Sequence, residues 1–164
     1  MSKADVREIA ILALVFAYVG AALAIFPKWT VDDAFITCRY AENLAIHGEL
    51  NWNPGEPPVE GYTGVALPVL LAGVSRLGGS PVTAGKVIGI LSFLLSVLMV
   101  HASLRVLGIG RAVRCLAAAL LGAAPLMLTH ALSGLETTLF MAAISLALFL
   151  LLKCLSHDGG GGAS

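Results

Sequence analysis

The sequence predicts an all-α integral membrane protein with four transmembrane helices and amphipathic surface helices in its first exoplasmic loop. Of the 164 residues, 58% are hydrophobic and only 12% are charged, whereas soluble domains carry about 25% charged residues. The mean hydropathy is +0.91. Four apolar runs are each long enough to cross the hydrocarbon layer of a bilayer as a helix.

The charge balance and the cysteine content exclude several other classes of protein. Ten basic and ten acidic residues give a formal net charge of zero, which excludes a nucleic-acid partner bound by a basic face. Intrinsic disorder requires low hydrophobicity and high charge, and this chain has the opposite. Three cysteines are too few and too scattered for a disulfide framework or a zinc cluster.

The apolar runs define the expected domain organisation. The four spans are expected at about residues 9–26, 82–107, 112–131 and 135–152, with an exoplasmic loop at residues 28–81. Within this loop Val65–Val74 is apolar but too short to span, so we expect it to lie in the membrane interface or to re-enter. Residues 1–153 form one membrane module, and the Gly-rich residues 154–164 are expected to be a flexible tail.

The basic residues predict the orientation, because cytoplasmic segments carry an excess of Lys and Arg. With four spans, one side of the membrane holds Lys3, Arg7, Arg105, Arg111, Arg114 and Lys153, and the other holds Lys28, Arg39, Arg76 and Lys86. A fifth span at Val65–Val74 would move Arg105, Arg111 and Arg114 outside, against the rule. We therefore expect both termini in the cytoplasm and the long loop outside.

Several polar residues have simple structural explanations. His101 and Arg105 lie one helical turn apart near the cytoplasmic end of a span. We expect them to snorkel toward the headgroups and to pair with other helices rather than to form a site. The expected topology places Cys38 outside and Cys115 and Cys154 near the inner face, so Cys38 cannot pair with the other two.

A pair of adjacent carboxylates begins the exoplasmic loop. Asp32 is a suitable N-cap, Asp33 suits the first turn of a helix, and Gly48 ends that helix. One arc of this helix carries Thr37, Tyr40, Ala41, Leu44 and Ala45. The carboxylates have two interpretations, helix capping or a general base or metal-binding group at the membrane edge, and their spacing does not choose between them.

Two further motifs leave the same choice open. The loop residues 53–56, Asn-Pro-Gly-Glu, predict a turn. The flanking Trp52 and Tyr62 suit either the aromatic belt of a membrane protein or a sugar-stacking platform. Ser133 and Glu136 have the spacing of a capping box at the start of the last span, but a carboxylate at that depth is costly unless it is used or paired.

These motifs together resemble the first exoplasmic loop of GT-C type membrane glycosyltransferases, most closely the arabinofuranosyltransferase-like branch and its bacterial relatives. The resemblance is carried by Asp32-Asp33-Ala34-Phe35-Ile36-Thr37, Arg39-Tyr40-Ala41, Asn53-Pro54-Gly55-Glu56, Glu60-Gly61-Tyr62-Thr63 and Ser133-Gly134-Leu135-Glu136-Thr137. Such relatives take a sugar from a polyprenyl-phosphate donor on the outer face of the membrane. They continue through many further spans, so we expect this chain to be the N-terminal part of such an enzyme.

The resemblance implies an inverting transfer of a hexose or pentose to a cell-envelope glycan or lipid acceptor, in a bacterial inner membrane. Asp32 or Asp33 would be the general base, and the pair could also hold a divalent cation such as Mg²⁺ or Mn²⁺. Residues expected to bind the donor phosphate, the sugar or the acceptor are Arg39, Tyr40, Glu60, Tyr62, Thr63, Lys86 and Glu136.

Two other classes of function remain open. The chain could be a noncatalytic membrane module or an assembly partner whose loop motifs persist without activity. A transporter of lipid-linked sugars is a further alternative. That class is expected to carry inverted repeats with broken helices at the membrane midplane, and the sequence shows neither of these patterns.

Overall fold

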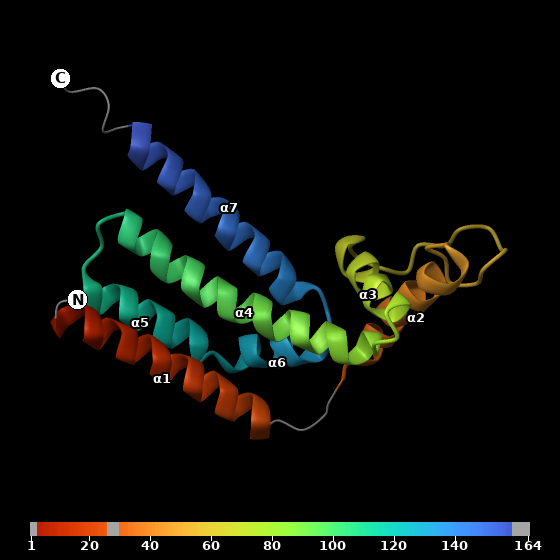
Figure 1. The fold of residues 1–164 in the computed structure, drawn as a ribbon, viewed down its shortest axis with the longest axis horizontal. Helices are drawn as coiled ribbons and strands as arrows, with labels where there is room; N and C mark the ends of the chain where they lie inside the picture. The colour runs from red at the N-terminus through yellow and green to blue at the C-terminus, as the bar shows by residue number, and fades with distance from the viewer. Residues whose placement is uncertain (1–2, 26–29, 159–164) are drawn as a thin grey trace.

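The computed structural model describes residues 3–25 and 30–158, and within these ranges the chain is helical, without strands (Figure 1). Its helices are α1 (Lys3–Ile25), α2 (Asp32–His47), α3 (Ala66–Arg76), α4 (Pro81–Val106), α5 (Arg111–Gly122), α6 (Pro125–Ser133) and α7 (Thr137–Asp158).

Helix α4 is the centre of the arrangement. It packs against α5, α6 and α7, and also against α2 and α3, whereas α1 packs against α5 and α6. As Figure 1 shows, α2 and α3 lie together where α4 begins, and we call this the loop end of the molecule. The beginning of α1, the end of α4 and the beginning of α5 lie at the opposite end. We call that region the arginine end, after Arg105, Arg111 and Arg114.

Two helices among the described residues are long and apolar enough to cross a membrane, Pro81–Val106 and Thr137–His157. They agree with the spans expected at residues 82–107 and 135–152. The last helix continues to Asp158, so residues 154–158 are helical instead of part of a flexible tail. Residues 159–164 lie outside the described part of the chain.

The span expected at residues 112–131 is not one straight helix. It is divided into α5 and α6, whose axes differ by 54°. Pro125 begins α6, and because proline has no N–H to donate, the hydrogen-bond ladder of α5 cannot continue through it. Counted as one broken span, or as a re-entrant pair, α5 and α6 raise the number of candidate spans to three. Helix α1 covers the first expected span up to Ile25 but is not among the candidate spans of the described residues, so the four-span topology stays a prediction.

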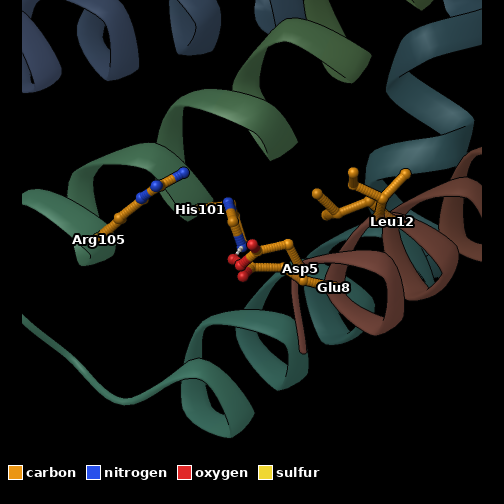
Figure 2. A pocket seen from close by; sticks show the side chains of 6 residues that line it. Asp5, Glu8, Leu12, His101 and Arg105 are labelled. Atoms are coloured by element: carbon orange, nitrogen blue, oxygen red, sulfur yellow. Dashed lines mark ion pairs between the residues drawn. The ribbon is translucent and has the colours of Figure 1, made fainter. Parts of the chain in front are cut away.

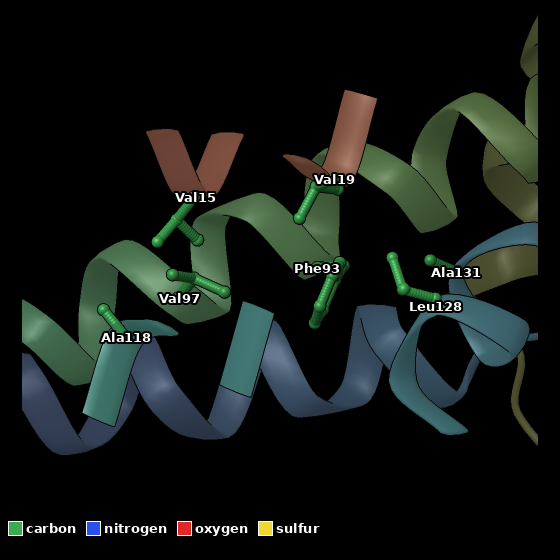
Figure 3. Close-up of a cluster of buried hydrophobic side chains, with 7 residues drawn as sticks. All are labelled: Val15, Val19, Phe93, Val97, Ala118, Leu128 and Ala131. Carbon is green, nitrogen blue, oxygen red and sulfur yellow. The ribbon is translucent and has the colours of Figure 1, made fainter. Parts of the chain in front are cut away.

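The main hydrophobic core joins four helices. Figure 3 shows Val15 and Val19 of α1 near Phe93 and Val97 of α4, and the same cluster takes in Ala118 of α5 with Leu128 and Ala131 of α6. Phe93 and Val97 are fully buried. Truncating a buried side chain of this size costs about 2–5 kcal/mol, so this cluster holds α1 onto the rest of the bundle.

A second cluster joins the two surface helices. Cys38 and Ala41 of α2 pack against Leu67, Leu71 and Ala72 of α3. Most of the predicted arc of α2 is confirmed, because Thr37, Tyr40 and Ala41 are buried while Leu44 and Ala45 are half-buried. All of the segment Val65–Val74 except its first residue therefore lies in α3, which packs on α2, and its position relative to the membrane stays a prediction.

The ends of α2 confirm one capping prediction and correct another. Gly48 ends the helix at φ 75°, and its N–H donates to the Leu44 carbonyl at 3.2 Å. Asp32 is not the N-cap. Val31 is the N-cap and has an extended backbone. Its carbonyl accepts a hydrogen bond from the Ala34 N–H at 3.0 Å, and its own N–H donates to the Ser133 carbonyl at 3.4 Å. Asp32 and Asp33 both lie in the first turn.

Candidate functional site

The turn between α6 and α7 forms one wall of the candidate site. Ser133 is the last residue of α6, and its hydroxyl donates to the His130 carbonyl at 2.8 Å and accepts from the Leu135 N–H at 3.2 Å. The predicted capping box is therefore wrong, because Ser133 ends one helix and does not begin the next. Glu136 directly precedes α7, its backbone carbonyl accepting from Phe140 at 2.9 Å.

This turn lies directly against the beginning of α2. Gly134 has φ 83°, and a Cβ atom built there would lie 3.1 Å from the Cβ of Ala34. On its other side the carbonyl of Gly134 would lie 3.4 Å from a Cβ atom on Gly85 of α4. Only a residue without a side chain combines this backbone conformation with so close an approach. The turn therefore brings two segments about a hundred residues apart in sequence, Asp33 and Glu136, to the same place.

A cavity of about 440 Å³ lies between these segments. Its lining residues come from α2, from the loop after it and from the α6–α7 turn: Asp33, Ile36, Thr37, Gly61, Tyr62, Thr63, Leu135, Glu136 and Thr137. Asp33 is exposed and Glu136 is half-buried. Neither carboxylate has a hydrogen bond or an ion pair within the described residues. Four of the predicted site residues, Asp33, Tyr62, Thr63 and Glu136, thus line one cavity.

Tyr40 does not line the cavity, but it packs behind Tyr62, which does. Its side chain is 1% exposed, and its hydroxyl donates to the Val59 carbonyl at 2.7 Å. The rings of Tyr40 and Tyr62 meet edge to face, with centroids 5.0 Å apart. Because such pairs and buried hydroxyl bonds have defined geometry, Tyr40 fixes the position of Tyr62 in the cavity wall.

Arg39 holds the neighbouring loop. Its guanidinium donates to the Trp52 carbonyl at 3.0 Å and to the Asn53 side chain at 2.9 Å, and it lies 4.2 Å from the centre of the Trp52 ring. The predicted turn is confirmed, because the Glu56 N–H donates to the Asn53 carbonyl at 3.3 Å. These contacts use Arg39 and Trp52 to shape the loop, on a side of α2 that does not line the cavity.

Besides Tyr40 and Arg39, three more of the predicted site residues lie outside the cavity wall. Asp32 and Glu60 are exposed, and Lys86 is half-buried in the second turn of α4. Lys86 has no hydrogen bond or ion pair within the described part of the chain. Thr37, by contrast, lines the cavity although it is not among the site residues that the sequence predicts. Thr37 is one helical turn after Asp33, and this spacing is the signal that would have found it.

Asn51 is a second residue that the sequence did not single out. It is 4% exposed. Its amide donates to the carbonyls of Asn53 and Glu56, at 2.9 and 2.8 Å, and its side-chain oxygen accepts from Trp52 and Val59. One buried amide therefore organises the loop that leads to Tyr62.

An apolar groove adjoins the polar cavity. It has a volume of about 160 Å³ and is lined by Gly64, Ala66, Leu67, Glu136, Leu139, Phe140 and Ala143. Glu136 lines both spaces. A polar space and an apolar space thus meet at one carboxylate, between the beginning of α3 and the first turns of α7.

The remaining chemistry of the loop end is limited. Among residues 3–25 and 30–158, no group of three or more His, Cys, Asp or Glu side chains is placed to hold a metal ion.

The thiol of Cys38 is buried, and burial, helped by the negative charge of Glu42, raises its pKa to about 11. Cys38 therefore carries little thiolate at neutral pH and is a packing residue.

Comparison with protein-family models, with curated proteins and with solved structures found no match to this chain. The resemblance to GT-C glycosyltransferases therefore rests on the loop motifs themselves.

Proposed function

We propose that this chain is a membrane glycosyltransferase, or the N-terminal part of one, that moves a sugar from a polyprenyl-phosphate donor to a cell-envelope glycan or lipid acceptor. The observation that supports the proposal best is the meeting of the two spaces at Glu136. An amphipathic donor needs an apolar surface for its chain beside a polar cavity for its sugar.

Asp33 is the general base in this proposal. Its carboxylate lines the cavity and has no partner within the described residues, so it is free to accept a proton. The acceptor oxygen bonds to the anomeric carbon while the bond from that carbon to the donor phosphate breaks. The proton passes to Asp33 and the electron pair leaves with the polyprenyl phosphate, which inverts the configuration of the sugar.

The other residues have supporting roles. Glu136 and Thr37 offer hydrogen-bonding groups to sugar hydroxyls, and Tyr62 offers an aromatic face. Of the two cations expected near the donor phosphate, Lys86 is the better candidate, because the side chain of Arg39 is hydrogen-bonded to the loop. The isoprenoid chain would occupy the groove along Leu139 and Phe140.

The test compares Asp33→Asn with Asp32→Asn, which is matched in chemistry and adjacent in sequence but outside the cavity wall. Transfer is measured from radiolabelled polyprenyl-phosphate pentoses and hexoses in membranes that contain the full-length protein. We expect Asp33→Asn to lower the rate about 10²- to 10⁴-fold, and Asp32→Asn to change it less than about threefold.

Equal rates in the two variants would contradict the assignment of the base. Absence of transfer by the unaltered protein from every donor in the panel would favour a noncatalytic module. Chelation of divalent cations in the same assay tests the metal, because a loss that Mg²⁺ or Mn²⁺ restores would show that transfer requires a divalent cation.

A further inference from the structure

A second group of charged side chains lies at the arginine end, away from the proposed catalytic cavity. Glu8 of α1 is 7% exposed. Its carboxylate accepts from Arg114 at 2.6 Å and from Arg111 at 2.9 Å, and Arg111 also pairs with Asp5 at 3.2 Å. The two arginines of α5 therefore neutralise the two carboxylates of α1.

Arg105 is the third arginine at this end, and it takes no part in the ion pairs of Arg111 and Arg114 with Asp5 and Glu8. It is exposed in the last turn of α4 and has no ion pair within the described residues. His101, one turn earlier, lies 2.9 Å from the Glu8 carboxylate, although the two are not aligned as a hydrogen bond. Apart from His101, the group has two carboxylates and three arginines, so one positive charge, that of Arg105, is left without a carboxylate.

Arg105 faces a cavity of about 300 Å³ between α1 and α4. The lining residues are Asp5, Glu8, Ile9, Leu12, His101 and Arg105. Figure 2 shows His101 and Arg105 extending from α4 on one side, with Asp5 and Glu8 on α1 opposite and Leu12 farther along α1. The cavity thus has charged groups at one end and aliphatic groups at the other.

The location restricts the ligand. Helix α4 is one of the two described helices that are long and apolar enough to cross a membrane, so its last turn belongs at the boundary between hydrocarbon and headgroups. A ligand that matches the cavity carries an anionic group at that boundary and an apolar chain below it. A phospholipid has this construction, whereas inorganic phosphate would leave Ile9 and Leu12 without a partner.

We propose that the cavity between α1 and α4 binds an anionic phospholipid, with its phosphate on Arg105 and part of its acyl chain along Ile9 and Leu12. The bound lipid would add a second link between α1 and α4 beside the contact of Glu8 with His101. This site is independent of the proposed glycosyl transfer, since none of its residues lines the catalytic cavity.

The test is a titration of the purified full chain in detergent with phosphatidylglycerol, with bound lipid counted by native mass spectrometry. Arg105→Gln removes the unpaired charge. Arg7→Gln is the matched control, because Arg7 is also exposed at the arginine end, has no ion pair within the described part of the chain and does not line the cavity. We expect one tightly bound lipid per chain, at least fivefold weaker binding in Arg105→Gln and unchanged binding in Arg7→Gln.

A second variant tests the apolar half of the cavity. Ile9→Ser is expected to weaken phosphatidylglycerol binding as well, because Ile9 lines the cavity and is 55% exposed without the lipid. Unchanged binding in Arg105→Gln would overturn the proposal, and so would equal losses in the two arginine variants, which would indicate nonspecific attraction. Competition by millimolar inorganic phosphate would show that the site takes free phosphate instead, and equal affinity for phosphatidylcholine would contradict the role of net charge.

Discussion

Glu8 and Glu136 are the same residue type at opposite ends of one helical bundle, and their surroundings differ. Glu8 is almost completely buried and contacts two arginines and a histidine. Glu136 is half-buried, lines two adjoining spaces and has no hydrogen bond or ion pair within the described residues. The first carboxylate is used to hold helices together, and the second is available to a ligand.

The difference shows how a membrane protein distributes its few charges. Charge is costly near hydrocarbon unless it is paired or used. At the arginine end the cost is met by pairing, so Glu8 connects α1 to α5. At the loop end Asp33 and Glu136 have no partner within the described residues, and the cost is reduced because Asp33 is exposed and Glu136 is only half-buried. Unpaired carboxylates that also line a cavity are therefore better markers of chemistry in this chain than carboxylates in general.

The first prediction concerns the side of the membrane on which each end lies, and its expected result is all or none. Glu60 is exposed in the loop after α2, and Cys154 is exposed near the end of α7. In oriented vesicles, an impermeant maleimide should label an introduced Glu60→Cys thiol and the native Cys154 from opposite sides. Detergent permeabilisation is the control, since it should expose both. Labelling of both thiols from the same side would contradict the expected topology, in which the loop end and the arginine end lie on opposite sides of the membrane.

The second prediction compares the two glutamates directly. Glu8→Gln removes the charge between Arg111 and Arg114, and breaking a buried pair costs about 3–5 kcal/mol. Because the side chain of Arg111 is 38% exposed, we expect a reduced loss of about 2–3 kcal/mol in the free energy of unfolding. Glu136→Gln should change that free energy by less than about 0.5 kcal/mol.

Both variants are measured by equilibrium unfolding in mixed micelles, and each glutamine is nearly the same size as the glutamate that it replaces. A destabilisation by Glu136→Gln as large as that by Glu8→Gln would mean that Glu136 has a structural role. In that case the unpaired carboxylate would no longer support the proposed site.

Much of the fold could be predicted from hydrophobicity and local chemistry. The apolar runs located α4 and α7, and the periodicity of α2 identified most of its buried arc. The break between α5 and α6 was harder to predict, because Pro125 lies inside a continuous apolar run. A hydropathy pattern does not include the missing N–H of a proline, so it predicts one continuous helix across this run.

The site could be predicted in part for a similar reason. The charge distribution placed Asp33 and Glu136 on the same side, and the structure brings them to one cavity. The role of Tyr40 depends on a contact with Val59, and the pairing of Glu8 depends on Arg111, which is 103 residues away in sequence. Contacts of this kind follow from tertiary packing, and no local pattern in a single sequence encodes them.

The last prediction has the smallest expected effect and examines how the loop end is assembled. Gly134 and Gly48 both have positive φ, 83° and 75°, so alanine at either position costs about 1 kcal/mol in backbone strain. At Gly48 the added methyl group meets nothing within 4 Å, whereas at Gly134 it would lie 3.1 Å from the Cβ of Ala34. Gly134→Ala should therefore lower the free energy of unfolding by about 2 kcal/mol, and Gly48→Ala by about 1 kcal/mol. Equal losses of unfolding free energy in the two variants would show that α2 can move away from the added methyl group at little cost. The turn would then not fix the separation of Asp33 from Glu136.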